Sequence, residues 1–290
     1  MTYYFGVDAG GSRCRSRLVD EHGTVLGIGE AGSANARIGI GKLRSALMSV
    51  WEQAVSASGL SEHALRDTRA GFGIAGMSRL GFREQLEELS LPFASVSYET
   101  DAVIANIGAH GGRDGAVLII GTGSTAHVRV DGGSFNIGGY GFPISDEGSG
   151  AALGLSAMRH ALRALDGRTR PTPLSAAVTE RFAHDTGRAI AWMDQATPRD
   201  YAAFAPFVMD YAESGDPIAR SIVEDSALHI ERFIETIFER GAPRCALAGG
   251  LAPRMRTWLR QRTVGRLSEP QGDPLDGALY LAGFRRSTES

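Results

Sequence analysis

The feature that most constrains this chain is a strand ending in a glycine turn, and it occurs twice. Residues 115–125 read Gly-Ala-Val-Leu-Ile-Ile-Gly-Thr-Gly-Ser-Thr. Their apolar run predicts a buried strand, and the alternating pattern over residues 127–132 predicts a second strand that doubles back after the turn. Residues 5–12, followed by the alternating segment 15–23, repeat this design. Two such units predict two related halves, each offering backbone N–H groups to a phosphate.

The glycines at these turns have a chemical reason. Several N–H groups can converge on one phosphate only where the backbone comes so close that a Cβ atom would collide, and Gly and Ser suit such a position. One Gly-Gly-Ser segment could be a simple hairpin turn, but two in matching contexts favour a nucleotide-binding role. Neither turn leads directly into a helix, and neither matches GxxxxGK[ST] or GxGxxG. Walker-type and Rossmann sites are therefore disfavoured.

Composition argues against several kinds of partner. The net charge is −3 and no block of like charges occurs, so neither nucleic acid nor a membrane surface is expected as the main partner. The chain begins without a basic stretch followed by an apolar one, and no apolar run reaches about 18 residues, which disfavours secretion and membrane spanning. Cys14 and Cys245 form no CxxC pair, which fits a reducing, cytoplasmic setting.

The order of the predicted elements indicates an α/β chain with two lobes. Strands over residues 2–30, 70–76 and 94–98, with helices between them, make up a first lobe. A new set of strands follows from residue 115. We therefore expect an N-terminal lobe of residues 1–112 and a C-terminal lobe of residues 113–290.

The second half of the chain is mainly helical. One helix is predicted over residues 174–186, with Gly187 as its stop, and a longer one over residues 217–240, with Gly241 as its stop. The last helix, over residues 276–285, is expected to pack back on the N-terminal lobe.

Two acidic residues at strand ends are candidates for chemistry. Asp8 ends the first strand, where a carboxylate can hold Mg²⁺ against nucleotide phosphates or merely stabilise the turn. Asp101 ends another strand and begins a helix. It is either an N-cap, a role that Thr100 could equally fill, or a general base that accepts the proton of an attacking hydroxyl. The spacing alone leaves these two interpretations even.

Two glycine-rich segments of the second half are further candidates. Residues 138–150 carry Asp146 and Glu147, which could face a polyhydroxylated ligand, or the Asp could cap the helix that follows. Gly249-Gly250 could let an adenine lie flat on the backbone, although a lone dipeptide is a weak signal.

Three motifs occur in order along the chain: Asp8-Ala9-Gly10-Gly11-Ser12, Gly121-Thr122-Gly123-Ser124 and Ala248-Gly249-Gly250. With them the chain resembles the superfamily of actin, heat-shock chaperones and sugar kinases. The resemblance implies two ribonuclease-H-like (actin-like ATPase) lobes with a nucleotide and sugar cleft between them. More narrowly, the chain resembles the N-acetylglucosamine kinase and benzoyl-CoA-reductase-type ATPase family over its whole length, and within it the bacterial glucosamine kinases. The narrower likeness rests on Ser33-Ala34-Asn35, Phe93-Ala94-Ser95, Thr100-Asp101-Ala102, residues 142–150 and Pro198-Arg199-Asp200-Tyr201.

The resemblance implies a role for each matched residue. Asp8 would be the Mg²⁺-associated carboxylate and Asp101 the catalytic base. The residues implied to contact ATP are Gly10, Gly11, Ser12 and Arg13 in the first phosphate turn, Gly121, Thr122, Gly123 and Ser124 in the second, and Gly249 and Gly250 at the adenosine. The residues implied to contact sugar hydroxyls are Asn35, Asp101, Ser124 and Asp146.

A few residues depart from the family pattern. Ala9 replaces the more usual glycine, and Ser12-Arg13 stands where Thr-Lys is common; both are tolerable at a phosphate turn. Tyr140 and Ser145 stand where the N-acetylglucosamine kinases usually show Trp and Gly. These two departures weaken the assignment to an acetylated sugar and leave the fold unaffected.

Together these features predict an ATP-dependent kinase that phosphorylates the 6-hydroxyl of glucosamine. The prediction includes ATP and Mg²⁺ as cofactors, a small amino sugar as substrate, and a cytoplasmic homodimer. One alternative changes the acceptor to N-acetylglucosamine. Another is an ATPase activator of an iron–sulfur dehydratase or reductase, which would need cysteine thiolates at a dimer interface. Neither cysteine lies in a motif that suggests this role.

Overall fold

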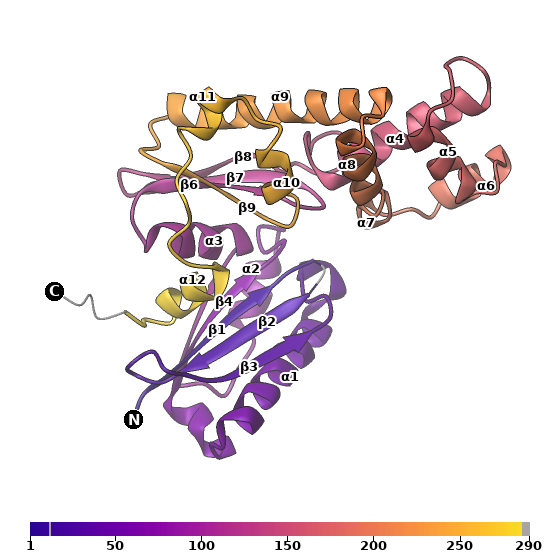
Figure 1. Ribbon diagram of the computed structural model, residues 1–290. Helices are drawn as coiled ribbons and strands as arrows, with labels where there is room; N and C mark the ends of the chain where they lie inside the picture. Colours follow the sequence, from indigo (N-terminus) through magenta and orange to yellow (C-terminus); the bar gives the residue numbers. More distant parts are fainter. Residues whose placement is uncertain (12, 286–290) are drawn as a thin grey trace. The chain divides into compact units, whose positions relative to one another are not determined.

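The computed structural model describes residues 1–11 and 13–285, which fall into two compact units (Figure 1). The first unit is Met1–Asp114 together with the segment that begins at Glu269, and the second unit is Gly115–Ser268. The sequence analysis expected lobes of residues 1–112 and 113–290, with the last helix packing back on the N-terminal lobe. In the structure, the chain leaves the second unit after Ser268, so that α12 (Pro274–Leu281) belongs to the first.

The first unit is built on a five-stranded mixed sheet in the order β3-β2-β1-β4-β5. β1 pairs antiparallel with β2, and β2 with β3, whereas β1, β4 and β5 run parallel to one another. The antiparallel β1–β2 pair confirms the hairpin predicted from the N-terminal glycine turn. The strands are β1 (Tyr3–Ala9), β2 (Cys14–Val19), β3 (Val25–Ala31), β4 (Thr68–Ile74) and β5 (Ser95–Glu99).

Helices cover both faces of this sheet. The Phe5 ring of β1 packs edge-on against Trp51 of α1, with ring centroids 5.1 Å apart. The next residue, Gly6, faces Leu279 of α12. Because successive strand residues point to opposite faces, α1 lies on one side of the sheet and α12 on the other, beside α3 (Figure 1). The helical segments are η1 (Ala36–Ile38), α1 (Ile40–Ser58), η2 (Glu62–Asp67), α2 (Phe82–Glu87) and α3 (Asp101–His110).

Glycines in the strands allow these helices to approach closely. A Cβ atom on Gly27 of β3 would lie 1.9 Å from the carbonyl oxygen of Ala54 in α1. A Cβ atom on Gly71 of β4 would lie 2.1 Å from the carbonyl oxygen of Ala278 in α12. Both helices therefore lie nearer to the sheet than any side chain would permit.

The second unit contains a four-stranded sheet in the order β8-β7-β6-β9. β6 pairs antiparallel with β7, and β7 with β8, while β9 runs parallel to β6. The β6–β7 pair confirms the second predicted hairpin. The strands are β6 (Gly115–Ile120), β7 (Ser124–Val130), β8 (Gly133–Gly138) and β9 (Cys245–Ala248).

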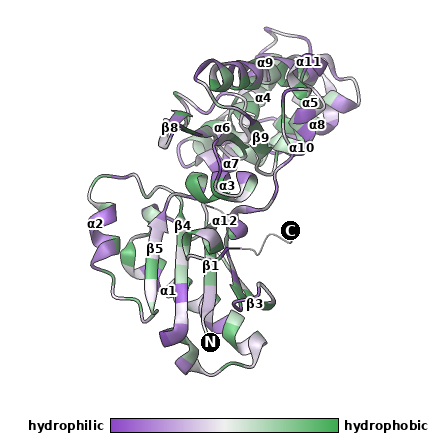
Figure 2. Cartoon of the chain, turned by 90° about the vertical axis from the view of Figure 1, so that its left-hand side faces the viewer, coloured by the Kyte–Doolittle hydropathy of each residue, from purple (hydrophilic) through white to green (hydrophobic). Residues whose placement is uncertain are grey.

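α9 (Pro217–Glu239) is the helix predicted over residues 217–240, and it lies along this sheet (Figure 1). Hydrophobic and hydrophilic segments alternate along it (Figure 2), and Ile230, Ile234 and Ile237 are fully buried against the strands. The other helices of the unit are α4 (Gly150–Leu165), α5 (Pro173–Glu180), α6 (Thr186–Met193), α7 (Pro198–Ala202), α8 (Ala205–Glu213), α10 (Ala252–Arg256) and α11 (Gln261–Val264).

The single helix predicted over residues 174–186 is wrong. α5 ends at Glu180, and Ala183 and His184 adopt left-handed φ angles of 52° and 57°. Such angles cannot continue a right-handed helix. The side chain of Asp185 then caps a new helix, α6, whose first turn contains the glycine that was expected to be a stop.

We expect Gly27→Ala to lower the free energy of unfolding by about 1–3 kcal/mol, because the added Cβ would overlap the backbone of α1. Gly41→Ala is the matched control. Gly41 lies in α1 with no atom within 4 Å of the added Cβ, so this change should leave stability unchanged or raise it by up to about 1 kcal/mol. Urea unfolding followed by circular dichroism measures both. A Gly27→Ala protein as stable as the parent would contradict the close packing of α1.

Candidate active site

The carboxyl ends of the parallel strands in the first unit bring two acidic residues to one edge of the sheet. Asp8 of β1 pairs with Gly73 of β4, which in turn pairs with Glu99, the last residue of β5. α3 begins two residues later, at Asp101. Ligands of open α/β sheets bind beyond this edge, so Asp8 and Asp101 lie where a ligand is expected.

The first glycine turn adjoins the same edge. The Gly10 N–H donates to the carbonyl oxygen of Arg13 at 3.0 Å, and the Gly10 carbonyl accepts from the Ala34 N–H at 3.1 Å. A Cβ atom on Gly11 would meet no other atom within 4 Å, so the backbone there is open to a ligand. Ser12, assigned to this turn from the sequence, falls outside the described residues.

The structure identifies the N-cap of α3 and the place of Asp101 beside it. Thr100 is the N-cap of α3, because its Oγ1 accepts from the Val103 N–H at 3.2 Å. Asp101 is the first residue of the helix, and its Oδ1 accepts from the Ala102 N–H at 3.0 Å. Burial, together with the charge of Asp8, raises the pKa of Asp101. A partly buried carboxylate with a raised pKa that is not the N-cap is compatible with the predicted general base.

Asn35 is attached to the same edge through its backbone. It forms a parallel bridge with Ala75, the residue that follows β4. Its Oδ1 accepts from the Arg37 N–H and its Nδ2 donates to Ser33 Oγ, both at 2.8 Å. These bonds fix the orientation of the amide, and each amide atom retains capacity for one further hydrogen bond.

In the second unit, the turn after β6 is closed by a carboxylate. The Gly121 N–H donates to the Gly123 carbonyl oxygen at 2.9 Å. The Ser124 N–H donates to Asp146 Oδ1 at 3.4 Å, and a Cβ atom on Gly123 would lie 2.9 Å from Asp146 Oδ2. Asp146 adopts a φ of 70°, a left-handed conformation that Asp tolerates better than most residues. The turn therefore has room for the carboxylate only because residue 123 is a glycine.

Gly249 and Gly250 lie beside this turn. β9 ends one residue earlier, and its neighbour in the sheet is the end of β6. Gly249 has a φ of 94°, and a Cβ atom on it would lie 2.4 Å from the carbonyl oxygen of Ile120. Gly250 has open space around it. The glycine pair thus leaves a flat stretch of backbone next to the second glycine turn.

The predicted residues therefore group within each unit. The described ones in the first unit share a sheet edge: Asp8, Gly10, Gly11, Arg13, Asn35 and Asp101. Those in the second unit surround the end of β6: Gly121, Thr122, Gly123, Ser124, Asp146, Gly249 and Gly250.

Sequence reasoning missed one residue at the first group. Arg15 of β2 lies directly opposite Asp8, and its Nη2 contacts Asp8 Oδ2 at 2.7 Å. The available signal was the length of the glycine turn, because four residues between Ala9 and Cys14 make Arg15 the cross-strand partner of Asp8.

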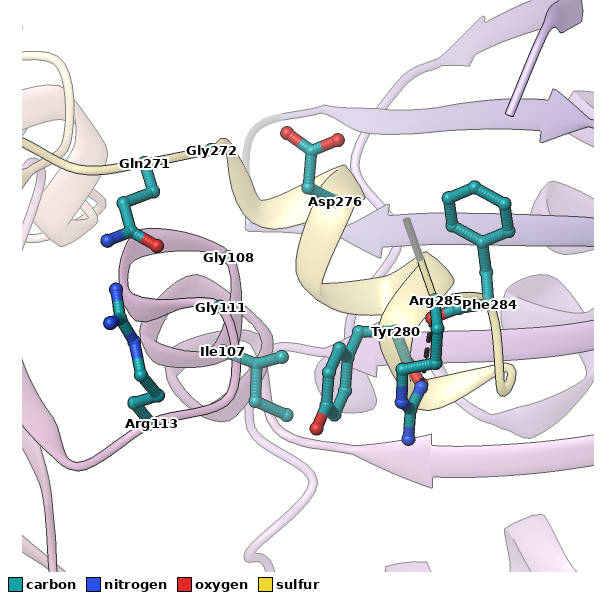
Figure 3. A pocket seen from close by; sticks show the side chains of 10 residues that line it. All are labelled: Ile107, Gly108, Gly111, Arg113, Gln271, Gly272, Asp276, Tyr280, Phe284 and Arg285. Carbon is teal, nitrogen blue, oxygen red and sulfur yellow. Dashed lines mark hydrogen bonds between the residues drawn. The ribbon is translucent and has the colours of Figure 1, made fainter. Parts of the chain in front are cut away.

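A cavity of about 530 Å³ in the first unit is separate from this group (Figure 3). It lies between the carboxyl-terminal half of α3 and α12, where Ile107 and Tyr280 face it. Asp101 begins α3, about 10 Å from Gly108 along the helix axis at 1.5 Å per residue. The cavity therefore does not contain the groups expected to do chemistry.

Asp8 fits a magnesium ion that is carried by a nucleotide. Among the residues that the structure describes, no group of three or more His, Cys, Asp or Glu could hold a metal. Mg²⁺ usually takes one or two protein carboxylates and completes its shell with water and substrate phosphates. A single protein carboxylate such as Asp8, without a full cage of ligands, suits that mode of binding.

The two cysteines do not suit an iron–sulfur cluster. Cys14 and Cys245 are both fully buried. Burial, helped at Cys14 by the charge of Asp8, raises the pKa of each thiol to about 12. Neither thiolate is available at a surface, which argues against the activator alternative.

Within residues 1–11 and 13–285, no helix is long and apolar enough to cross a membrane.

We expect Asp101→Asn to stabilise the fold at neutral pH, and the gain to disappear as the pH falls. The pKa of Asp101 is raised in the folded state, so ionisation disfavours folding above that pKa and has no effect below the pKa of an unfolded Asp. Asp200→Asn should instead lower the free energy of unfolding at neutral pH, and this loss should shrink as the pH falls. The reason is that hydrogen bonds from the hydroxyl and N–H of Thr197 lower the pKa of Asp200 in the folded state. Urea unfolding at about pH 4 and about pH 8 measures both. Equal stabilisation by Asp101→Asn at the two pH values would contradict the raised pKa.

The chain is similar over nearly its whole length to sugar kinases. It is 37% identical to the glucosamine kinase GspK of Vibrio cholerae, over 98% of this chain and 96% of that protein. It is 26% identical to the N-acetylmuramic acid/N-acetylglucosamine kinase of Clostridium acetobutylicum, over 82% of this chain and 80% of that one. The crystal structure of a proposed N-acetylglucosamine kinase from Chromobacterium violaceum matches with a TM-score of 0.92 and 34% identity, over 97% of this chain and 99% of that one.

These similarities confirm the resemblance and the fold class inferred from the glycine motifs. The family model for the BadF/BadG/BcrA/BcrD ATPases matches residues 5–282. The chain belongs to the BadF/BadG/BcrA/BcrD ATPase family.

Proposed function

We propose that this protein is an ATP-dependent kinase that transfers the γ-phosphoryl group to the 6-hydroxyl of glucosamine. The observation that carries the proposal is Asp101, a partly buried carboxylate with a raised pKa in the first turn of a helix whose N-cap is Thr100. The 37% identity to a glucosamine kinase over almost the full chain supports the substrate. Phosphoryl transfer depends mostly on positioning and charge stabilisation, and both groups of residues described above are suited to that task.

Asp101 orients the 6-hydroxyl and accepts its proton. Its raised pKa supports this role, because a base with a higher pKa binds the proton more strongly once it is deprotonated. The hydrogen bond from the Ala102 N–H fixes one oxygen and leaves the other for the substrate.

Residues 10–13 and 121–124 bind the phosphates. The N–H groups of Gly10, Gly121 and Ser124 hold the turns in shape, so the other N–H groups of the two turns are the phosphate donors. The open backbone at Gly11 supports the first assignment, and the adjacent Gly249 and Gly250 support an adenosine site beside the second turn. Asp8 is associated with Mg²⁺, and when bound this ion neutralises charge on the phosphates. The protein's own part is to fix the carboxylate at the end of β1.

Asn35, Asp101, Ser124 and Asp146 contact the sugar hydroxyls. Asn35 supports this because its amide is held in one orientation and keeps a free donor and acceptor capacity. Ser124 is held by a 2.7 Å hydrogen bond from its Oγ to the Glu147 carbonyl. The two carboxylates of the 138–150 segment favour an amino sugar, whose ammonium group they can attract, over a neutral acetamido sugar. We further propose that the enzyme is a homodimer and that it works in the cytoplasm, where reducing conditions suit its two free thiols.

A panel of sugars with a coupled ADP-release assay tests the substrate. We expect kcat/KM for glucosamine to exceed that for N-acetylglucosamine by about tenfold or more, because only the amine carries a positive charge. A higher kcat/KM for N-acetylglucosamine would reassign the acceptor. Absence of ADP release with every amino sugar would contradict the kinase function itself.

Asp101→Asn tests the general base. We expect kcat to fall by about 10²- to 10⁴-fold, since the variant keeps the shape but cannot accept a proton. Glu99→Gln is the matched control. Glu99 ends β5, two residues before Asp101, and its Oε2 lies 3.9 Å from Arg83 Nη2 at the surface. It should change kcat by less than about threefold. A loss below about tenfold for Asp101→Asn would remove Asp101 from this role.

A further inference from the structure

The ion pair between Arg15 and Asp8 is incomplete. The two residues are directly opposed across β1 and β2, and a single contact joins Arg15 Nη2 to Asp8 Oδ2 at 2.7 Å. Among the described residues, this is the one hydrogen bond of the Arg15 guanidinium. Guanidinium–carboxylate pairs that serve structure are frequently bidentate, with two parallel hydrogen bonds. The pair observed here uses one of five donors.

The remaining donors are not satisfied by the fold. Arg15 Nε is buried and has no hydrogen-bond partner, which is an unfavourable state for a charged donor. The side chains of Arg15 and Asp8 are nevertheless 28% and 18% exposed, so the outer part of the pair can be reached by a ligand. One hydrogen bond and an unpaired Nε hold the guanidinium only weakly, so a competing cation can displace it from Asp8.

Charge explains why the guanidinium rests there. Asp8 and Asp101 lie at the same edge of the sheet, and the charge of Asp8 raises the pKa of Asp101. Arg17, the other arginine on this face of β2, is occupied by Asp273 and Asp276 at 2.9 Å each. Arg15 is thus the guanidinium that compensates Asp8.

We propose that Arg15 is the resident counter-ion of Asp8: it holds this carboxylate when nucleotide is absent, competes with free Mg²⁺ for it, and leaves it when the metal–nucleotide complex binds. The inference rests on the proposed function only in taking Asp8 as the metal-associated carboxylate. In this proposal Arg15 is a positioning residue. It keeps free metal from binding to Asp8 and gives way when the metal binds together with the nucleotide. One cation at a time then balances Asp8.

The first test measures metal affinity in the full-length, nucleotide-free protein. Mn²⁺ is titrated as a probe and its free concentration is followed by electron paramagnetic resonance. Arg15→Met and Arg15→Gln remove the charge, so both should bind Mn²⁺ about tenfold or more tightly than the parent protein. Arg15→Lys retains the charge and should stay within about threefold. Arg17→Met, which removes a guanidinium that does not contact Asp8, is the matched control and should also stay within about threefold.

The second test uses ATP without metal, in the presence of EDTA, with binding measured by calorimetry. The neutral variants should bind metal-free ATP more weakly by about tenfold, because an uncompensated Asp8 repels the phosphates. A merely structural role for Arg15 would weaken both Mn²⁺ and ATP binding, so opposite signs identify the counter-ion role. Thermal unfolding in the absence of ligands checks that each variant is folded. If Arg15→Met or Arg15→Gln does not fold, the other still gives the measurement.

The outcomes separate the two proposals. Unchanged or weaker Mn²⁺ binding in the folded neutral variants would overturn the role of Arg15, whatever the activity of the enzyme. If the parent protein binds no ATP even with Mg²⁺, the proposed function fails, while the Mn²⁺ titration still reports on Asp8. Tighter Mn²⁺ binding that Asp8→Asn abolishes in the Arg15→Met background would place the metal on Asp8 and support the proposal.

Discussion

Repulsion between two carboxylates is the interaction on which the chemistry of the first unit depends. Asp8 ends β1 and Asp101 begins α3, and the topology brings both to one sheet edge. Burial there raises the pKa of Asp101, and the charge of Asp8 raises it further. Such an edge favours any cation that can reach it, whether the guanidinium of Arg15 or the metal of a nucleotide complex. The same electrostatics therefore support the roles that we propose for Asp101 as base, for Asp8 as metal-associated carboxylate and for Arg15 as its counter-ion.

The position of Asp101 is fixed by packing one turn further along α3. A Cβ atom on Gly73 of β4 would lie 2.1 Å from Ile104 Cδ1, and one on Gly277 of α12 would lie 1.8 Å from the Ile104 carbonyl oxygen. α3 is therefore held between the sheet and α12 by contacts that only glycine permits. Because Ile104 and Asp101 are three residues apart on a helix, these contacts also determine where the carboxylate lies. Glycines far from the phosphate turns thus contribute to the precision of the site.

The sequence contained the glycine turns, and these predicted both hairpins correctly because turn residues and alternation are local signals. It could not choose between the two roles of Asp101, since Thr100 and Asp101 are both good caps and only hydrogen-bond geometry separates them. Arg15 was missed because a strand pattern does not state which residue lies opposite which; the turn length does. The helix over residues 174–186 was predicted as continuous because its apolar spacing does not reveal the left-handed angles at Ala183 and His184.

The two related hairpins differ where their chemistry would differ. In the first, Ala9 pairs with Cys14 across the turn, and the next pair inward is Asp8 with Arg15. In the second, Ile120 pairs with Ser124, and the next pair inward is Ile119 with Thr125. The charged pair of one hairpin is therefore an uncharged pair in the other. The first hairpin thus carries the carboxylate that we propose for the metal and the guanidinium opposite it, whereas the second carries only neutral side chains at the matching positions.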